Sequence, residues 1–168
     1  MSEGKNFFIK ADAAVKAVLK YITLVMFSIL MVIIALNVLN RLIPVTSFHW
    51  LDEIIELCFA AMTFYGAAAV WITKGHYSAG NWLEKRMKNE KGAYLLRLLV
   101  DCISLTFLVI LFYFSLSLVL KTQEVTAVFQ IPRSVLYLCM PTSSLIMILY
   151  TVYFMIEDFK TILPELKK

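Results

Sequence analysis

Three acidic residues, Asp52, Glu53 and Glu56, stand at the start of a long apolar run and are the side chains best suited to chemistry. A carboxylate inside a membrane-spanning helix is a candidate for a proton or coupling-ion site, because a charge in hydrocarbon is costly. The alternative is a cluster at the membrane boundary that pairs with Arg41 or with a partner subunit. We favour the boundary cluster, because Glu56 lies only about two helical turns into the run.

Histidine and cysteine offer no chemistry of their own in this chain. The only histidines, His49 and His76, are predicted on opposite sides of the membrane, so they cannot share a metal or a haem. Cys58, Cys102 and Cys139 form no CxxC pair and are typical of small apolar filler. The sequence therefore predicts no cofactor, no metal site and no catalytic residue, and we do not expect an enzyme.

Long uncharged runs must position the acidic residues. They are Tyr21–Asn40, Leu57–Thr73, Cys102–Leu120 and Ser134–Ile156. Each has roughly the ~20 residues that a helix needs to cross hydrocarbon, and only 17% of the chain is charged while 61% is hydrophobic. The sequence predicts an all-α integral membrane protein whose single membrane domain, 1–168, has four transmembrane spans at about 21–43, 50–73, 94–120 and 133–156.

The basic residues predict the orientation of the chain in the membrane. Of the 16 lysines and arginines, all but Arg41, Lys121 and Arg133 lie near the two termini, between the second and third spans or, for Arg97, just beyond that loop. By the positive-inside rule, both termini, the tail 157–168 and the middle loop are cytoplasmic. The net charge of +4 is thus explained by topology, and we expect no nucleic-acid partner.

Cytoplasmic amphipathic segments are expected to contact membrane lipids. Residues 5–20 have an apolar stripe opposite Asp12, Lys16 and Lys20. This segment is either an interfacial helix in the headgroup plane or a simple extension of the first span. The middle loop, with Trp82 beside several charged residues, is typical of a short interfacial helix.

Prolines, a glycine and one charge pair indicate local features of the spans. Pro132 suits the first turn of the fourth span, and Pro141 is expected to kink that span. Gly66 and the alanines after it favour close helix packing. Arg97 and Asp101 are spaced to form an ion pair on one face. Because we find no internal repeat, broken span or midplane polar site, we do not expect transport by this chain alone.

An ordered motif runs through residues 41–76. It consists of Arg41, Trp50, Asp52, Glu53, Gly66, Gly75 and His76, with Trp50 nine residues after Arg41. The stretch resembles the DctQ-type small membrane subunit of tripartite ATP-independent periplasmic (TRAP) transporters. That family has an arginine after the first span, then W-x-E-E, a glycine, and G-x-H or a near variant. Asp52 in place of the first glutamate is a mild departure.

The resemblance implies a multi-pass protein of the bacterial inner membrane and two protein partners. A periplasmic substrate-binding protein captures a carboxylate, such as a dicarboxylate, sialic acid or a similar organic acid. A large multi-span permease subunit then imports the carboxylate by sodium symport, so sodium ions are expected in that subunit. The small subunit is implied to be a scaffold for the large one and a docking aid for the periplasmic protein.

Site roles follow from the resemblance as hypotheses. Arg41, Trp50, Asp52 and Glu53 would stabilise the outer hairpin and contribute to a subunit interface, although Trp50 could be a belt aromatic alone. His76 is expected to be interfacial. Two rival functions remain: a homodimeric proton-coupled exporter that uses Glu56, and a membrane assembly protein without transport. The sequence does not identify the carboxylate or the spans that face the large subunit.

Overall fold

The computed structural model describes residues 2–42, 50–73 and 90–162, nearly all of them helical. The helices are α1 (Ser2–Leu42), α2 (Trp50–Ile72), α4 (Glu90–Lys121), α5 (Arg133–Tyr137) and α6 (Cys139–Ile162). By length and composition, four segments of the described chain can cross a membrane: Asp12–Asn40, Trp50–Ile72, Leu96–Lys121 and Arg133–Phe159. The predicted class, an all-α membrane protein with four long apolar helices, is confirmed.

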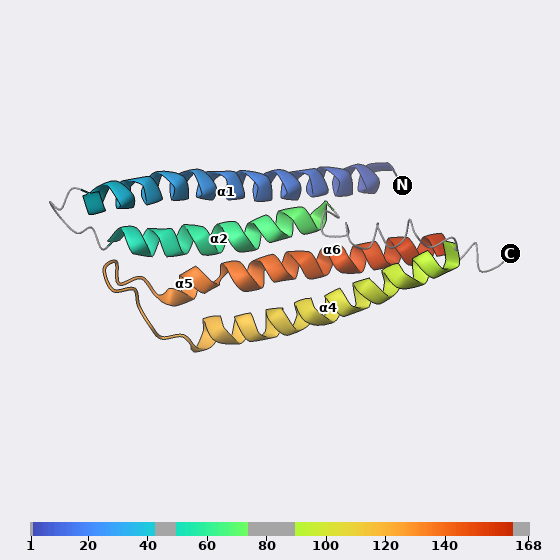
Figure 1. The fold of residues 1–168 in the computed structure, drawn as a ribbon. Helices are drawn as coiled ribbons and strands as arrows, with labels where there is room; N and C mark the ends of the chain where they lie inside the picture. The colour runs from blue at the N-terminus through green and yellow to red at the C-terminus, as the bar shows by residue number, and fades with distance from the viewer. Residues whose placement is uncertain (1, 43–49, 74–89, 163–168) are drawn as a thin grey trace.

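The helices pack in the order α1, α2, α6, α4 (Figure 1). Within the described residues, the backbones of α1 and α4 do not approach each other closely, so this order is open and not a closed ring. The chain alternates direction, so α2 and α6 run parallel at the centre. We call the end where α1 begins and α6 ends the terminal end. The opposite end, where α4 joins α5, is the loop end.

Helix α1 is continuous over its 41 residues. At 1.5 Å per residue its length is about 60 Å, roughly twice the thickness of a hydrocarbon core. Residues 5–20 thus continue the first span without a break, which favours the extension over a separate helix in the headgroup plane. The predicted interfacial helix around Trp82 and the end of the tail, 163–168, lie outside the described residues.

The fourth span is locally disturbed near its start. Helix α5 ends at Tyr137, and α6 begins at Cys139 after a single intervening residue, Leu138. Pro141 explains this position, because it has no backbone N–H to donate to the Tyr137 carbonyl and its ring crowds that carbonyl. The predicted disturbance therefore occurs one turn before the proline. Leu138 itself keeps a helical backbone (φ −58°, ψ −26°). Its amide donates to the Ser134 carbonyl (3.1 Å) and its carbonyl accepts from the Thr142 amide (3.2 Å), so the span continues through this residue.

Polar side chains hold the two central helices together. The Trp71 indole of α2 donates to Thr151 Oγ1 of α6 (2.9 Å), and the hydroxyls of Tyr65 and Thr142 lie 3.0 Å apart. Other buried hydroxyls of α6 bond backward to carbonyls of their own helix, as Ser144 does to Met140. Such side chains are compact and internally satisfied, so helices can approach closely without leaving polar groups unmet.

The core also receives one residue from each end helix. Leu19 of α1 and Leu108 of α4 pack with Ala68, Ile72 and Met147 in a single buried cluster. Both end helices, α1 and α4, therefore pack against the central pair along one stripe.

The structure also shows where Gly66 and Asp101 lie in this packing. Gly66 faces α1, where an added Cβ would lie 3.4 Å from Thr23 Cγ2, so the backbones approach closely and room remains for one methyl group. Asp101, expected near the cytoplasmic boundary, has a side chain that is only 1% exposed, while Arg97 is partly exposed.

Candidate interaction site at the loop end

Asp52 joins the first two helices at the loop end. It lies in the first turn of α2, where the helix dipole favours an acidic side chain. Its Oδ1 accepts a hydrogen bond from the Asn37 side-chain amide of α1 (3.1 Å). The partner is therefore an uncharged amide in the last turns of α1. The side chain of Arg41, the cation expected here, lies outside the described part of α1, so its pairing stays a prediction.

Glu53, the next residue, contacts a different part of the molecule. Its two carboxylate oxygens accept hydrogen bonds from the backbone amides of Val128 (2.5 Å) and Phe129 (3.2 Å). These amides belong to the segment between α4 and α5. Glu53 therefore ties α2 to the second helical hairpin, and the two adjacent acids connect α2 to opposite neighbours.

The segment 122–132, which we call the α4–α5 loop, is ordered by its own hydrogen bonds. Val125 and Pro132 form an isolated antiparallel bridge. Within it, the Thr126 amide donates to the Ile131 carbonyl (2.9 Å), and the Ile131 amide donates to Thr126 Oγ1 (3.1 Å). Gln130 closes the turn with a left-handed backbone (φ 54°). This tight turn leaves the amides of residues 128 and 129 directed toward Glu53.

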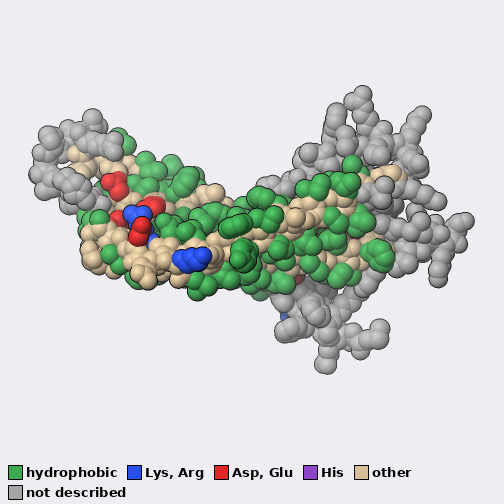
Figure 2. Space-filling view, turned by 90° about the horizontal axis from the view of Figure 1, so that it is seen from below, with side chains coloured by type: hydrophobic (Ala, Val, Ile, Leu, Met, Phe, Trp, Pro, Cys, Tyr) green, Lys and Arg blue, Asp and Glu red, His purple; other side chains and the backbone are tan. Residues whose placement is uncertain are grey.

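Further charged residues surround the base of the α4–α5 loop. Arg133 Nη1 lies 3.5 Å from Glu124 Oε2, and the Arg133 amide donates to the Glu124 carbonyl (2.9 Å). The Arg133 guanidinium also interacts electrostatically with Glu56, one turn after Glu53 on α2. Figure 2 shows acidic and basic side chains together at this end, with hydrophobic side chains along the middle of the molecule. Glu56 therefore belongs to a charged boundary cluster.

The remaining motif residues do not form one site. Trp50 opens α2 at the loop end, and its side chain is 37% exposed. Gly66 lies four turns further along α2 against α1, away from the acids. Gly75 and His76 are outside the described residues. Trp50, Asp52, Glu53 and Glu56 thus share the loop end, while the other motif positions lie elsewhere or are not described.

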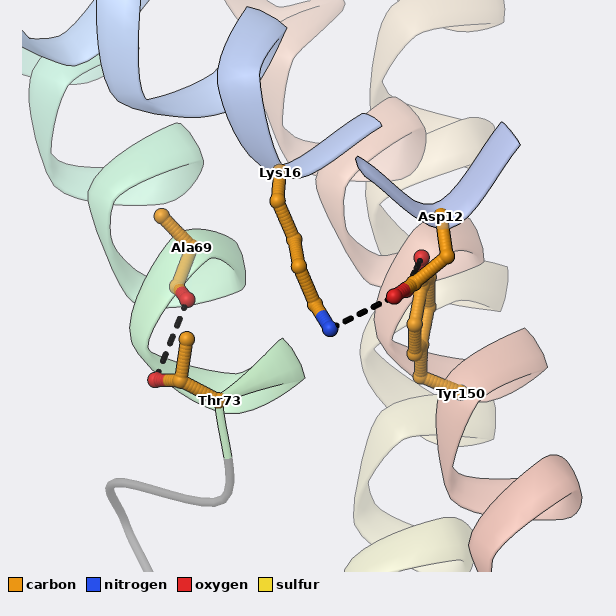
Figure 3. Close-up of polar contacts among 5 residues, drawn as sticks. All are labelled: Asp12, Lys16, Ala69, Thr73 and Tyr150. Atoms are coloured by element: carbon orange, nitrogen blue, oxygen red, sulfur yellow. Dashed lines mark hydrogen bonds and ion pairs between the residues drawn. The ribbon is translucent and has the colours of Figure 1, made fainter. Parts of the chain in front are cut away.

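A second polar cluster lies at the terminal end (Figure 3). The Asp12 carboxylate of α1 accepts a hydrogen bond from the Tyr150 hydroxyl of α6 (2.7 Å) and pairs with Lys16 Nζ (2.6 Å). Nearby, the Thr73 hydroxyl folds back on carbonyls of the last turn of α2. Asp12 and Lys16 were expected only as the solvated face of an amphipathic segment. The structure instead gives them a contact that fastens α1 to α6.

The sequence identified the acidic residues of this site but not the groups that donate hydrogen bonds to them. Asn37 is polar within an apolar span, and that signal was available, but its spacing to Asp52 depends on the hairpin between them. The loop amides bound by Glu53 carry no sequence signal, because every residue except proline has a backbone amide. Within the described residues no group of histidine, cysteine and acidic side chains is placed to hold a metal ion.

The described carboxylates at the two ends of the bundle have structural roles: they join helices to one another and to the α4–α5 loop. No curated protein sequence matches the chain. The profile of one family, described as "Tripartite ATP-independent periplasmic transporters, DctQ component", matches residues 30–161, which is most of the chain and runs from the last part of α1 nearly to the end of α6. The chain therefore belongs to the DctQ family and is a small membrane component of a TRAP transporter.

Proposed function

We propose that this chain is a static scaffold subunit that lies beside the large permease subunit of a TRAP transporter in the bacterial inner membrane. The transporter imports a carboxylate, such as a dicarboxylate or sialic acid, together with sodium ions. The periplasmic binding protein would capture the carboxylate, and the large subunit would bind both the carboxylate and the sodium ions. Family membership supports this proposal.

The surface of the two end helices is the observation that carries the scaffold role. In the described part of α1 only Leu19 and Leu30 are buried, and in α4 only Asp101, Leu108 and Ser115 are. Both helices nevertheless span long apolar segments. Each packs against the central pair along a single stripe and leaves most of its apolar surface for lipid or a partner. An open row of this kind suits a wall against which a larger subunit can be fixed.

The loop end is proposed as the docking aid for the periplasmic binding protein. Its acids are already engaged: Asp52 with Asn37, and Glu53 with the α4–α5 loop. These contacts hold the first turn of α2 and the loop in one arrangement. We assign Trp50, Asp52 and Glu53, together with Arg41, to maintaining that arrangement. The positive-inside rule supports placing this end in the periplasm and both termini in the cytoplasm.

The exporter alternative requires a carboxylate that alternates between two sides of the membrane. Glu56 is exposed, lies at the loop end and shares the electrostatic environment of Arg133. That placement favours a fixed boundary role. The exporter therefore stays only as an outcome that the following experiment can detect.

The test is mild-detergent affinity purification of the tagged chain from membranes of a cell that also makes the large and periplasmic subunits. We expect recovery of the large subunit in about equal amount. Carboxylate uptake into liposomes should then require both membrane subunits, the periplasmic protein and a sodium gradient. Recovery of this chain alone as a homo-oligomer, or sodium-independent uptake by this chain alone, would refute the proposal.

A further inference from the structure

Tyr113 projects from α4 on the side that faces away from the other helices. Its side chain is 68% exposed. Its ring packs edge-on against Phe114, with centroids 5.5 Å apart. No hydrogen bond joins its hydroxyl to any residue that the structure describes. A polar group on the outer surface of a membrane helix therefore lacks a partner within the described chain.

The depth of Tyr113 makes this hydroxyl unusual. The apolar part of α4 is bracketed by the basic residues Arg97 and Lys121, about 36 Å apart at 1.5 Å per residue. A hydrocarbon core of about 30 Å centred between them places Tyr113 about 6 Å from the midplane. Helical side chains also tilt toward the N-terminus of their helix. The Tyr113 side chain is thus directed toward the midplane, away from the headgroups at the loop end.

Other exposed hydroxyls on the spans donate hydrogen bonds to backbone carbonyls of their own helix. Ser28 donates to the Leu24 carbonyl (2.9 Å), and Thr106 donates to the Cys102 carbonyl (2.8 Å). A tyrosine hydroxyl stands too far from its own backbone to do this. The equally exposed Tyr21 and Tyr153 lie near charged residues at the terminal end, where headgroups and water are within reach.

We propose that the outer stripe of α4 around Tyr113 is the surface to which the large permease subunit binds, and that this subunit supplies a hydrogen-bond acceptor to the Tyr113 hydroxyl. The inference rests on the proposed function, because it needs that subunit. The stripe consists of Leu99, Ile103, Phe107, Ile110, Tyr113 and Phe114, each at least half exposed. Lipid covers apolar side chains well but offers a midplane hydroxyl no acceptor. Large aromatic side chains are also typical anchors of protein interfaces.

The mid-span surface of α1, at the opposite end of the row, presents no such hydroxyl among its described residues. At mid-span α1 exposes Val25, Phe27, Met31 and Val32, which lipid tails can cover. Its exposed hydroxyl there, Ser28, is satisfied by its own helix. The α1 surface therefore serves as the matched control surface, with similar exposure and hydropathy.

Site-specific photo-crosslinking tests the assignment of faces. The photoreactive residue p-benzoylphenylalanine is placed at Phe107, Ile110 or Phe114 on α4, and at Phe27 or Met31 on α1. The chain is made together with the large TRAP permease subunit and irradiated in the membrane. We expect crosslinks to the large subunit from the α4 positions only. Crosslinking of the large subunit from the α1 positions alone would overturn the inference. So would α4 positions that crosslink only to lipid or to a second copy of this chain.

A single-atom variant tests the hydroxyl itself. Tyr113→Phe is expected to weaken association with the large subunit about two- to tenfold, the usual effect of losing one hydrogen bond. Tyr21→Phe and Tyr153→Phe are the matched controls and should retain full association. Equal retention by all three variants would contradict the proposed acceptor. If the unaltered chain recovers no large subunit, the proposed function itself fails. If it does so but α4 does not crosslink, only the choice of face fails.

Discussion

Replacing Thr151 by valine is expected to loosen α6 from α2. The Thr151 side chain is fully buried and accepts the indole hydrogen bond of Trp71 at 2.9 Å. Its own hydroxyl donates to the Met147 carbonyl (2.8 Å). Valine has nearly the same shape, so packing should be preserved while the acceptor is lost. The Trp71 indole, which is half-buried, would then be left without this partner.

The magnitude follows from the kind of bond that is broken. Leaving a buried donor without an acceptor costs about 1–3 kcal/mol in soluble proteins. Measured interhelical hydrogen bonds in membranes are weaker, about 0.6 kcal/mol on average and about 1.7 at most. Because the Met147 carbonyl is also an acceptor in the helix, loss of the bond from Thr151 adds little. We therefore expect Thr151→Val to reduce the free energy of unfolding by about 1–2 kcal/mol.

A double-mutant cycle isolates this bond from changes in packing. The unaltered chain, Thr151→Val, Trp71→Phe and the double variant are unfolded reversibly from mild detergent into sodium dodecyl sulfate. Circular dichroism follows the loss of helix. We expect a coupling of about 0.6–1.7 kcal/mol between the two positions. A coupling within about 0.3 kcal/mol of zero, the level of independent sites, would refute the view that this bond joins the central helices.

Three further substitutions test other contacts. Glu53→Gln removes the charge that holds two loop amides, so hydrogen exchange at residues 128 and 129 should accelerate while α2 is unchanged; unaltered exchange would contradict the contact. Gly66→Ala should be tolerated, whereas Gly66→Leu should lower the unfolding midpoint, because only one methyl group fits against α1. An unchanged midpoint for Gly66→Leu would disprove this close approach. Tyr150→Phe releases Asp12 from α6 and should raise exchange in residues 12–19, and equal protection would show that this contact is dispensable.

The acidic pair shows where prediction from the sequence ends. The first-turn position of Asp52 and Glu53 follows from the pattern around Trp50. Successive residues on a helix point about 100° apart, so the two carboxylates are directed to different sides of α2. Asp52 contacts α1, and Glu53 contacts amides 75 and 76 residues later in the chain. A distant loop amide has no recognisable residue type, so only the folded chain reveals that partner.

The fourth span illustrates a partial success of the same reasoning. Pro141 predicts a disturbance, because proline cannot donate a backbone hydrogen bond. The structure places the disturbance at Leu138, one turn earlier, beside the Tyr137 carbonyl that lacks its donor, and the helical backbone continues through it. Whether a proline bends or interrupts a helix depends on neighbouring packing, which the local sequence does not contain.

The sequence by itself determined the solvent, the helical class and the number of spans, because long uncharged runs must satisfy their backbone internally in hydrocarbon. It also determined the family, through the motif between residues 41 and 76. Only the tertiary structure decided the neighbour order α1, α2, α6, α4 and the exposed stripe of α4. The physical reason is that lipid-facing and protein-facing surfaces are equally apolar in a membrane. Helix pairing therefore depends on close packing and a few interhelical hydrogen bonds, which exist only in the folded chain.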